Sequence, residues 1–143
     1  MSFEIVRVIR AAVAVAVLET LINAYPFHPF YPLPTAIYAV LEALFYLVII
    51  CIAAFIATRI PSSAGWAQKL VFFIFVVTPS LVSSYIFYRN VSFYQQGGRA
   101  LVTDHRVTMA GFEHLLTNLG IAALLALVAA LIYFRASPQP TQA

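Results

Sequence analysis

The feature that most constrains this chain is a pair of long stretches without a single charged residue, at residues 70–88 and 115–134. Each is about as long as the ~20 residues that an α-helix needs to cross a bilayer. Of the 143 residues, 63% are hydrophobic and 9% are charged, whereas soluble domains carry roughly 25% charged residues. The sequence therefore predicts an integral membrane protein.

Four segments have the length and composition of a membrane span, and they predict an all-α, polytopic bundle of four transmembrane helices. The spans are expected at residues 5–24, 34–58, 67–88 and 110–134. They form a single domain at residues 1–136, followed by a short polar tail at 137–143 that we expect to be disordered. The first span is the weakest, because it contains Arg7, Arg10 and Glu19. Its basic start also suits a signal peptide, but its apolar centre is short and ends at Glu19.

The basic residues lie mostly at the ends of the predicted spans, where they indicate how the chain is oriented. One side of the membrane carries Arg7, Arg10, Arg59, Lys69 and Arg135, and the other carries Arg89, Arg99 and Arg106. This excess predicts that both termini are cytoplasmic. The net charge of +3 therefore reports membrane topology, and no nucleic-acid partner is expected.

The two connections on the opposite, outer side are unusual. The first, YPFHPFYPLP at residues 25–34, combines prolines and aromatic residues around His28, which suits a stiff path at the headgroups. The second is the longest connection, and it includes Asp104 and His105. Residues 91–103 within it alternate on both sides of Gly97 and Gly98, which predicts a short β-hairpin. An irregular loop is the alternative.

Polar side chains within the predicted spans gather in the outer halves, as the helical rise of about 1.5 Å per residue places them. A charged side chain at mid-membrane costs roughly 2.5–3.5 kcal/mol, so each needs a partner, water or a changed protonation state. Bundled together, these side chains predict a polar pocket that opens to the outer side above an apolar floor. The predicted ligand-binding residues are Glu19, Asn23, Glu42, Ser83, Ser84, His114 and Asn118.

Rows of small residues at helical spacing lead into two of these polar sites. Small side chains let membrane helices approach closely, so we expect both rows to face other helices. The first row is Ala12, Ala16, Glu19 and Asn23, and the second is His114, Asn118, Ala122, Ala126 and Ala130.

Each candidate also has a purely structural interpretation. Glu113 points about 100° away from His114, and an acid in the first turns of a helix interacts well with the helix dipole. His114 can be a buried histidine bonded to Asn118 or Glu19, and Glu42 has tyrosines one turn away on either side. The secondary site candidates are Glu113, His28, Asp104 and His105.

Three functions are compatible with these features. The first is binding of a cation or small polar ligand, with exchange of a proton for the cation and transport as one use, in a homo-oligomer. The second is a non-catalytic accessory or assembly subunit of a larger membrane complex that contacts lipid or a quinone. The third is a membrane enzyme or metal site, disfavoured because no HExxH or ExxH motif is present. No cofactor is firmly implied, although a metal or a quinone is compatible.

Overall fold

The computed structural model describes residues 4–24 and 32–135. His28 and the predicted tail at residues 137–143 lie outside the described residues. The helical elements are α1 (Ile5–Glu19), the π-helical turn η1 (Thr20–Ala24), α2 (Pro32–Thr58), the 3₁₀ turn η3 (Ser62–Ala64), α3 (Gly65–Asn90) and α4 (Met109–Tyr133). A sheet between α3 and α4 contains β1 (Tyr94–Gln96), β2 (Arg99–Thr103) and β3 (Arg106–Val107).

Three helices are long and apolar enough to cross a membrane, at Leu33–Thr58, Gly65–Asn90 and Met109–Tyr133. They confirm the helical membrane character predicted for these segments. The first helix, α1, is shorter than the predicted span. Its 15 residues rise about 22 Å, which is less than the ~30 Å hydrocarbon core. A fourth span therefore stays a prediction.

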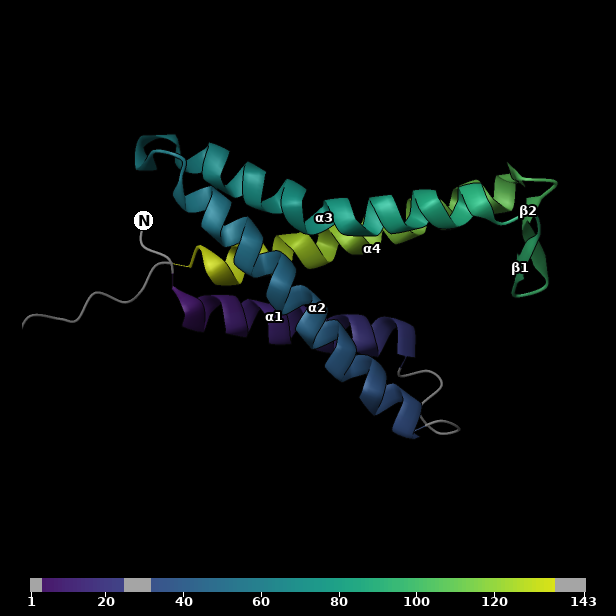
Figure 1. Ribbon diagram of the computed structural model, residues 1–143, viewed down its shortest axis with the longest axis horizontal. Helices are drawn as coiled ribbons and strands as arrows, with labels where there is room; N and C mark the ends of the chain where they lie inside the picture. Colours follow the sequence, from purple (N-terminus) through teal and green to yellow (C-terminus); the bar gives the residue numbers. More distant parts are fainter. Residues whose placement is uncertain (1–3, 25–31, 136–143) are drawn as a thin grey trace, which may run out of the picture.

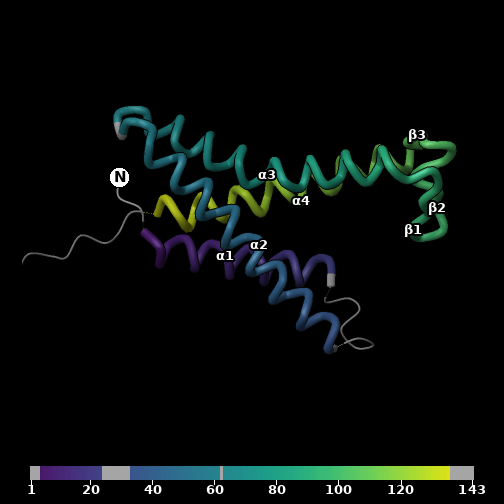
Figure 2. The backbone as a smooth tube through the Cα atoms, viewed as in Figure 1, coloured from purple at the N-terminus to yellow at the C-terminus, as the bar shows by residue number. Residues whose placement is uncertain are grey.

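The four helices form a ring, in which α1 and α3 each contact both α2 and α4. In Figure 1, α3 and α4 run together towards the sheet, which lies at one end of the bundle. We call this the sheet end; it also contains η1 and the start of α2. The opposite end contains the start of α1 and the end of α4. Figure 2 follows the same path as a backbone tube, with all three strands labelled.

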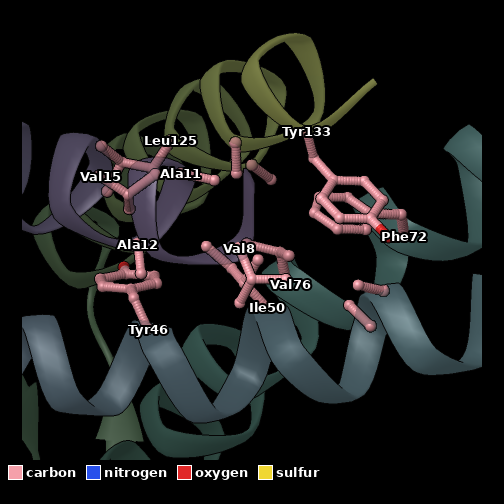
Figure 3. Close-up of a cluster of buried hydrophobic side chains, with 14 of the residues drawn as sticks. Val8, Ala11, Ala12, Val15, Tyr46, Ile50, Phe72, Val76, Leu125 and Tyr133 are labelled. Atoms are coloured by element: carbon pink, nitrogen blue, oxygen red, sulfur yellow. The ribbon is translucent and has the colours of Figure 1, made fainter. Parts of the chain in front are cut away.

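Apolar side chains fill the centre of the ring. Val8 and Ile50 are fully buried, and Leu125 nearly so; Figure 3 shows them between the helices. The burial also confirms the two predicted alanine faces, because Ala12 and Ala126 are 1% and 0% exposed. Small side chains at these positions let the helix backbones come close together.

Helix α3 continues through Pro79, which lies near the middle of its length. A proline lacks the amide hydrogen that would bond to the preceding turn, so it weakens or kinks a helix there. The Thr78 hydroxyl donates to the carbonyl of Ile74 at 2.7 Å. Figure 1 shows that α3 changes direction part way along, as the Thr-Pro pair leads one to expect.

The predicted hairpin around Gly97 and Gly98 is confirmed. Both glycines have positive φ values, +57° and +75°, as a tight turn between antiparallel strands requires. The structure adds a third strand, which the sequence pattern did not predict. It joins β2 through a second turn, in which Asp104 and His105 also have positive φ values of 48° and 59°. The sheet order is β1-β2-β3, with both pairs antiparallel.

The sheet is fixed to the start of α4 by Thr108 and Gly111. The Thr108 hydroxyl accepts from the Gly111 amide at 3.1 Å and so caps α4. The same hydroxyl donates to the carbonyl of Ala100 in β2 at 2.7 Å, so it links the start of the helix to the sheet. The Thr108 amide donates to the Leu101 carbonyl at 3.0 Å. Gly111 is buried directly against that carbonyl. These contacts set where β1 lies relative to the bundle.

Candidate functional site

A polar cavity of about 420 Å³ lies at the sheet end and is lined by residues of α1, η1, α2, α3, α4 and β1. Six of the seven predicted ligand-binding residues line it, namely Glu19, Asn23, Ser83, Ser84, His114 and Asn118. These side chains are far apart in the sequence, and the ring of helices brings them together. The structure thus places them in one site, while their role in binding a ligand stays a prediction.

Four further residues with polar groups line this cavity and were not predicted: Tyr46, Ser80, Tyr94 and Gln96. Tyr94 and Gln96 belong to β1, so the sheet forms one wall of the cavity. The alternation around Gly97 and Gly98 predicted the strand but not the surface that it covers. Ile121 and Leu125 line the cavity on its apolar side.

Glu19 is the last residue of α1, immediately before the π-helical turn η1. A π-helical turn is wider than an α-helical one and is frequently found at functional sites. Here it continues the helix to Asn23, which also lines the cavity. The Oε2 atom of Glu19 is buried and has no hydrogen-bond partner among the described residues. A buried carboxylate oxygen of this kind is costly unless something binds it.

Glu42 is the predicted site residue that the structure does not place on the cavity wall. It lies on α2 between Tyr38 and Tyr46, each four residues away, so that all three lie on one face of the helix. The Glu19 carboxyl group is hydrogen-bonded to the side chains of Glu42 and Tyr46, and Glu42 is also hydrogen-bonded to Tyr38. Glu42 therefore contacts Glu19 without lining the cavity itself.

His114 and Asn118 interact with each other, one helical turn apart on α4. The Asn118 Nδ2 and the His114 Nε2 are 3.2 Å apart. The amide nitrogen is a donor, so this contact is a hydrogen bond in the tautomer that has its ring proton on Nδ1 and leaves Nε2 free to accept. This pair is the structural interpretation that the sequence offered for His114, and it leaves the imidazole on the cavity wall.

The serines of α3 connect the polar cavity to a neighbouring apolar one. The Ser83 hydroxyl donates to the carbonyl of Ser80 at 3.1 Å, within the helix. Ser80 and Ser84 also line a second cavity of about 290 Å³ between α3 and α4, whose other walls are mostly leucine and aromatic side chains. Asn118 borders both cavities. A ligand with a polar and an apolar part would therefore find both surfaces adjacent.

The three secondary candidates that the structure describes, Glu113, Asp104 and His105, do not line the cavity. Glu113 is largely exposed, and its carboxylate lies 3.8 Å from the guanidinium of Arg99. Such an exposed pair contributes little, about 0–1 kcal/mol. Asp104 and His105 are exposed in the turn between β2 and β3. His28 cannot be placed because it lies outside the described residues.

Two results bear on the class of protein. Within the described residues, no group of three or more His, Cys, Asp or Glu side chains is arranged to hold a metal ion. The chain matches no protein-family model, no curated protein and no solved structure. What the fold itself defines is a helical protein of membrane character, with three apolar helices of spanning length and a small sheet.

Proposed function

We propose that the polar cavity binds a small organic cation, with Glu19 as its counter-ion. The observation that carries this proposal is the buried Glu19 Oε2, which has no hydrogen-bond partner among the described residues and belongs to a residue on the cavity wall. Among the described residues that line the cavity, Glu19 is the one carboxylic acid, and as a carboxylate it is the one negatively charged group. A positively charged ligand would supply the missing partner and neutralise that charge.

The lining of the cavity favours an organic cation over a metal ion. Its volume, about 420 Å³, lies in the ~300–1,000 Å³ range of small-molecule sites. Tyr46 and Tyr94 line it, and aromatic rings attract ammonium and similar groups through their faces. A divalent metal would require more carboxylate or imidazole ligands than this wall provides.

The proposal includes placement of α1 within the bilayer as a fourth span. Together, α1 and η1 form a continuous helical stretch from Ile5 to Ala24. The face of α1 turned away from the bundle is apolar, with Val6, Ile9, Val13 and Val17 between 46% and 56% exposed. Lipid is the environment in which such a face is stable. The orientation predicted from the basic residues would put the cavity on the outer side.

Binding is tested by titrating purified protein with a series of quaternary ammonium ions and their neutral carbon isosteres, using calorimetry in detergent. We expect the cations to bind and the isosteres to bind at least tenfold more weakly. Glu19→Gln should abolish the preference for charge. Glu113→Gln is the matched control, because it removes the same charge from an exposed position outside the cavity.

Equal binding of cations and isosteres would contradict the proposal, as would an unchanged preference in Glu19→Gln. The circular dichroism spectrum of Glu19→Gln should match that of the unmodified protein, so that loss of binding is not loss of fold. Transport is a separate claim that requires uptake of a bound cation into vesicles.

One observation favours the accessory-subunit function as a second candidate. Apolar side chains are exposed around the start of α4 and the edge strand β3, including Val107 at 42%, Met109 at 76% and Phe112 at 53%. Exposed apolar surface beside an unpaired strand edge is typical of contact with another chain. The mass of the complex extracted from its native membrane in mild detergent distinguishes a cation-binding protein from an accessory subunit. Co-purification of unrelated chains at fixed stoichiometry would favour the accessory-subunit function.

A further inference from the structure

A groove of about 730 Å³ lies between α3 and α4 at the opposite end of the bundle from the polar cavity. Its walls are almost entirely apolar, with Leu70, Phe73, Leu127 and Leu131 among the residues that line it. Both helices are long and apolar enough to cross a membrane. When they span the bilayer, this groove lies among the acyl chains of the lipids. Its apolar wall suits a hydrocarbon chain.

Two cations, Lys69 and Arg135, line the same groove. Lys69 lies in the first turns of α3, and Arg135 lies just beyond the end of α4, so both are at the level where a spanning helix meets the headgroups. In the part of the chain that the structure describes, neither forms an ion pair with an acid. Glu4, near the start of α1, pairs instead with Arg7.

We propose that this groove binds an anionic phospholipid, with an acyl chain along the apolar wall and the phosphate between Lys69 and Arg135. The negative charge of the headgroup complements Lys69 and Arg135. The apolar wall begins beside these two residues and would contact the acyl chain of the same lipid. Basic pockets between membrane helices bind anionic headgroups for the same physical reason. The site shares no residue with the polar cavity and does not depend on the function proposed for it.

The single tryptophan of the chain provides a local reporter. Trp66 lies one turn before Lys69 on α3 and is 73% exposed. The protein would be reconstituted into phosphatidylcholine vesicles that contain a minority of either brominated phosphatidylglycerol or brominated phosphatidylcholine. We expect brominated phosphatidylglycerol to quench Trp66 fluorescence at a lower mole fraction than brominated phosphatidylcholine does. Each of Lys69→Gln and Arg135→Gln should weaken this preference about fivefold, the factor that corresponds to about 1 kcal/mol for each cation near an anionic headgroup.

Arg59→Gln is the matched control for general attraction of anionic lipid to a basic surface. Arg59 lies just after α2, at the same end of the bundle, where its guanidinium stacks over Phe55 at 4.7 Å from the ring centre, and it does not line the groove. We expect Arg59→Gln to keep the preference. Equal quenching by the two lipids in the unmodified protein would overturn the proposal. So would a loss in Arg59→Gln as large as that in Lys69→Gln. Unchanged circular dichroism in each variant establishes that the helices still form.

Discussion

Gly111→Ala is a sharp test of how the sheet is held against the bundle. A methyl group at position 111 would come inside contact distance of the Leu101 carbonyl oxygen and within 2.8 Å of Val107 Cγ1. The carbonyl belongs to the backbone of β2, so it cannot rotate out of the way as a side chain can. Either β2 or the first turn of α4 must move.

The loss of stability in Gly111→Ala follows from one favourable and two unfavourable contributions. Alanine is the better helix former by about 1 kcal/mol, and this favours the variant. Overpacking costs about 1–3 kcal/mol. Displacement of the Leu101 carbonyl also weakens its hydrogen bond with the Thr108 amide, at about 1 kcal/mol. We therefore expect the docking of the sheet to lose about 1–3 kcal/mol of stability.

Hydrogen–deuterium exchange in detergent measures this loss locally. Amides of β2 should exchange roughly 5- to 150-fold faster in Gly111→Ala, because exchange reports the free energy of local opening. Gly120→Ala is the matched control, since Gly120 lies on the same helix and a methyl group there meets nothing within 4 Å. Unchanged exchange at residues 99–103 in Gly111→Ala would refute the reasoning, and so would an equal increase in Gly120→Ala.

Two further substitutions test other contacts of α4. Thr108→Ala should speed exchange in the first turn of α4 and in β2, because it removes a helix cap worth about 0.5–2 kcal/mol and the bond to Ala100; Thr108→Ser, which keeps the hydroxyl, should retain most of the protection. Ala126→Leu should lower the thermal unfolding midpoint in detergent, since Ala126 is fully buried and overpacking costs about 1–3 kcal/mol. The same change at Ala123, which is half-buried, should be milder, and equal effects would contradict a close helix contact at Ala126.

The level of the polar side chains in the bundle could be predicted because a helix rises by a fixed amount per residue. Depth along the spans and the i, i+4 rows placed His114 and Asn118 near Glu19, and the structure brings all three to one cavity. Depth alone does not give direction. Glu42 interacts with Glu19 but does not line the cavity, whereas Tyr46, one turn further along the same face of α2, does.

The remaining features depend on contacts between residues distant in the sequence. The alternation around Gly97 and Gly98 predicted a hairpin, but it contains no information on where that hairpin docks. Docking is set by the close approach of Gly111 to Leu101 and by the hydrogen bonds of Thr108, and these bring Tyr94 to the cavity. The third strand was missed because β3 has two residues, too few for an alternating pattern to be recognised.

The arrangement of polar and apolar layers limits what binding at Glu19 can accomplish. Beyond the cavity, Leu125 forms part of both its wall and the packed core, and Val15 and Ile50 are fully buried behind it. A cation at Glu19 therefore has no polar path through the described part of the bundle. If vesicle uptake accompanies binding, these side chains must separate in a second conformation, and Ala126→Leu should change uptake more than binding. If binding occurs without uptake, the cavity is a one-sided site that holds its ligand above the packed apolar core.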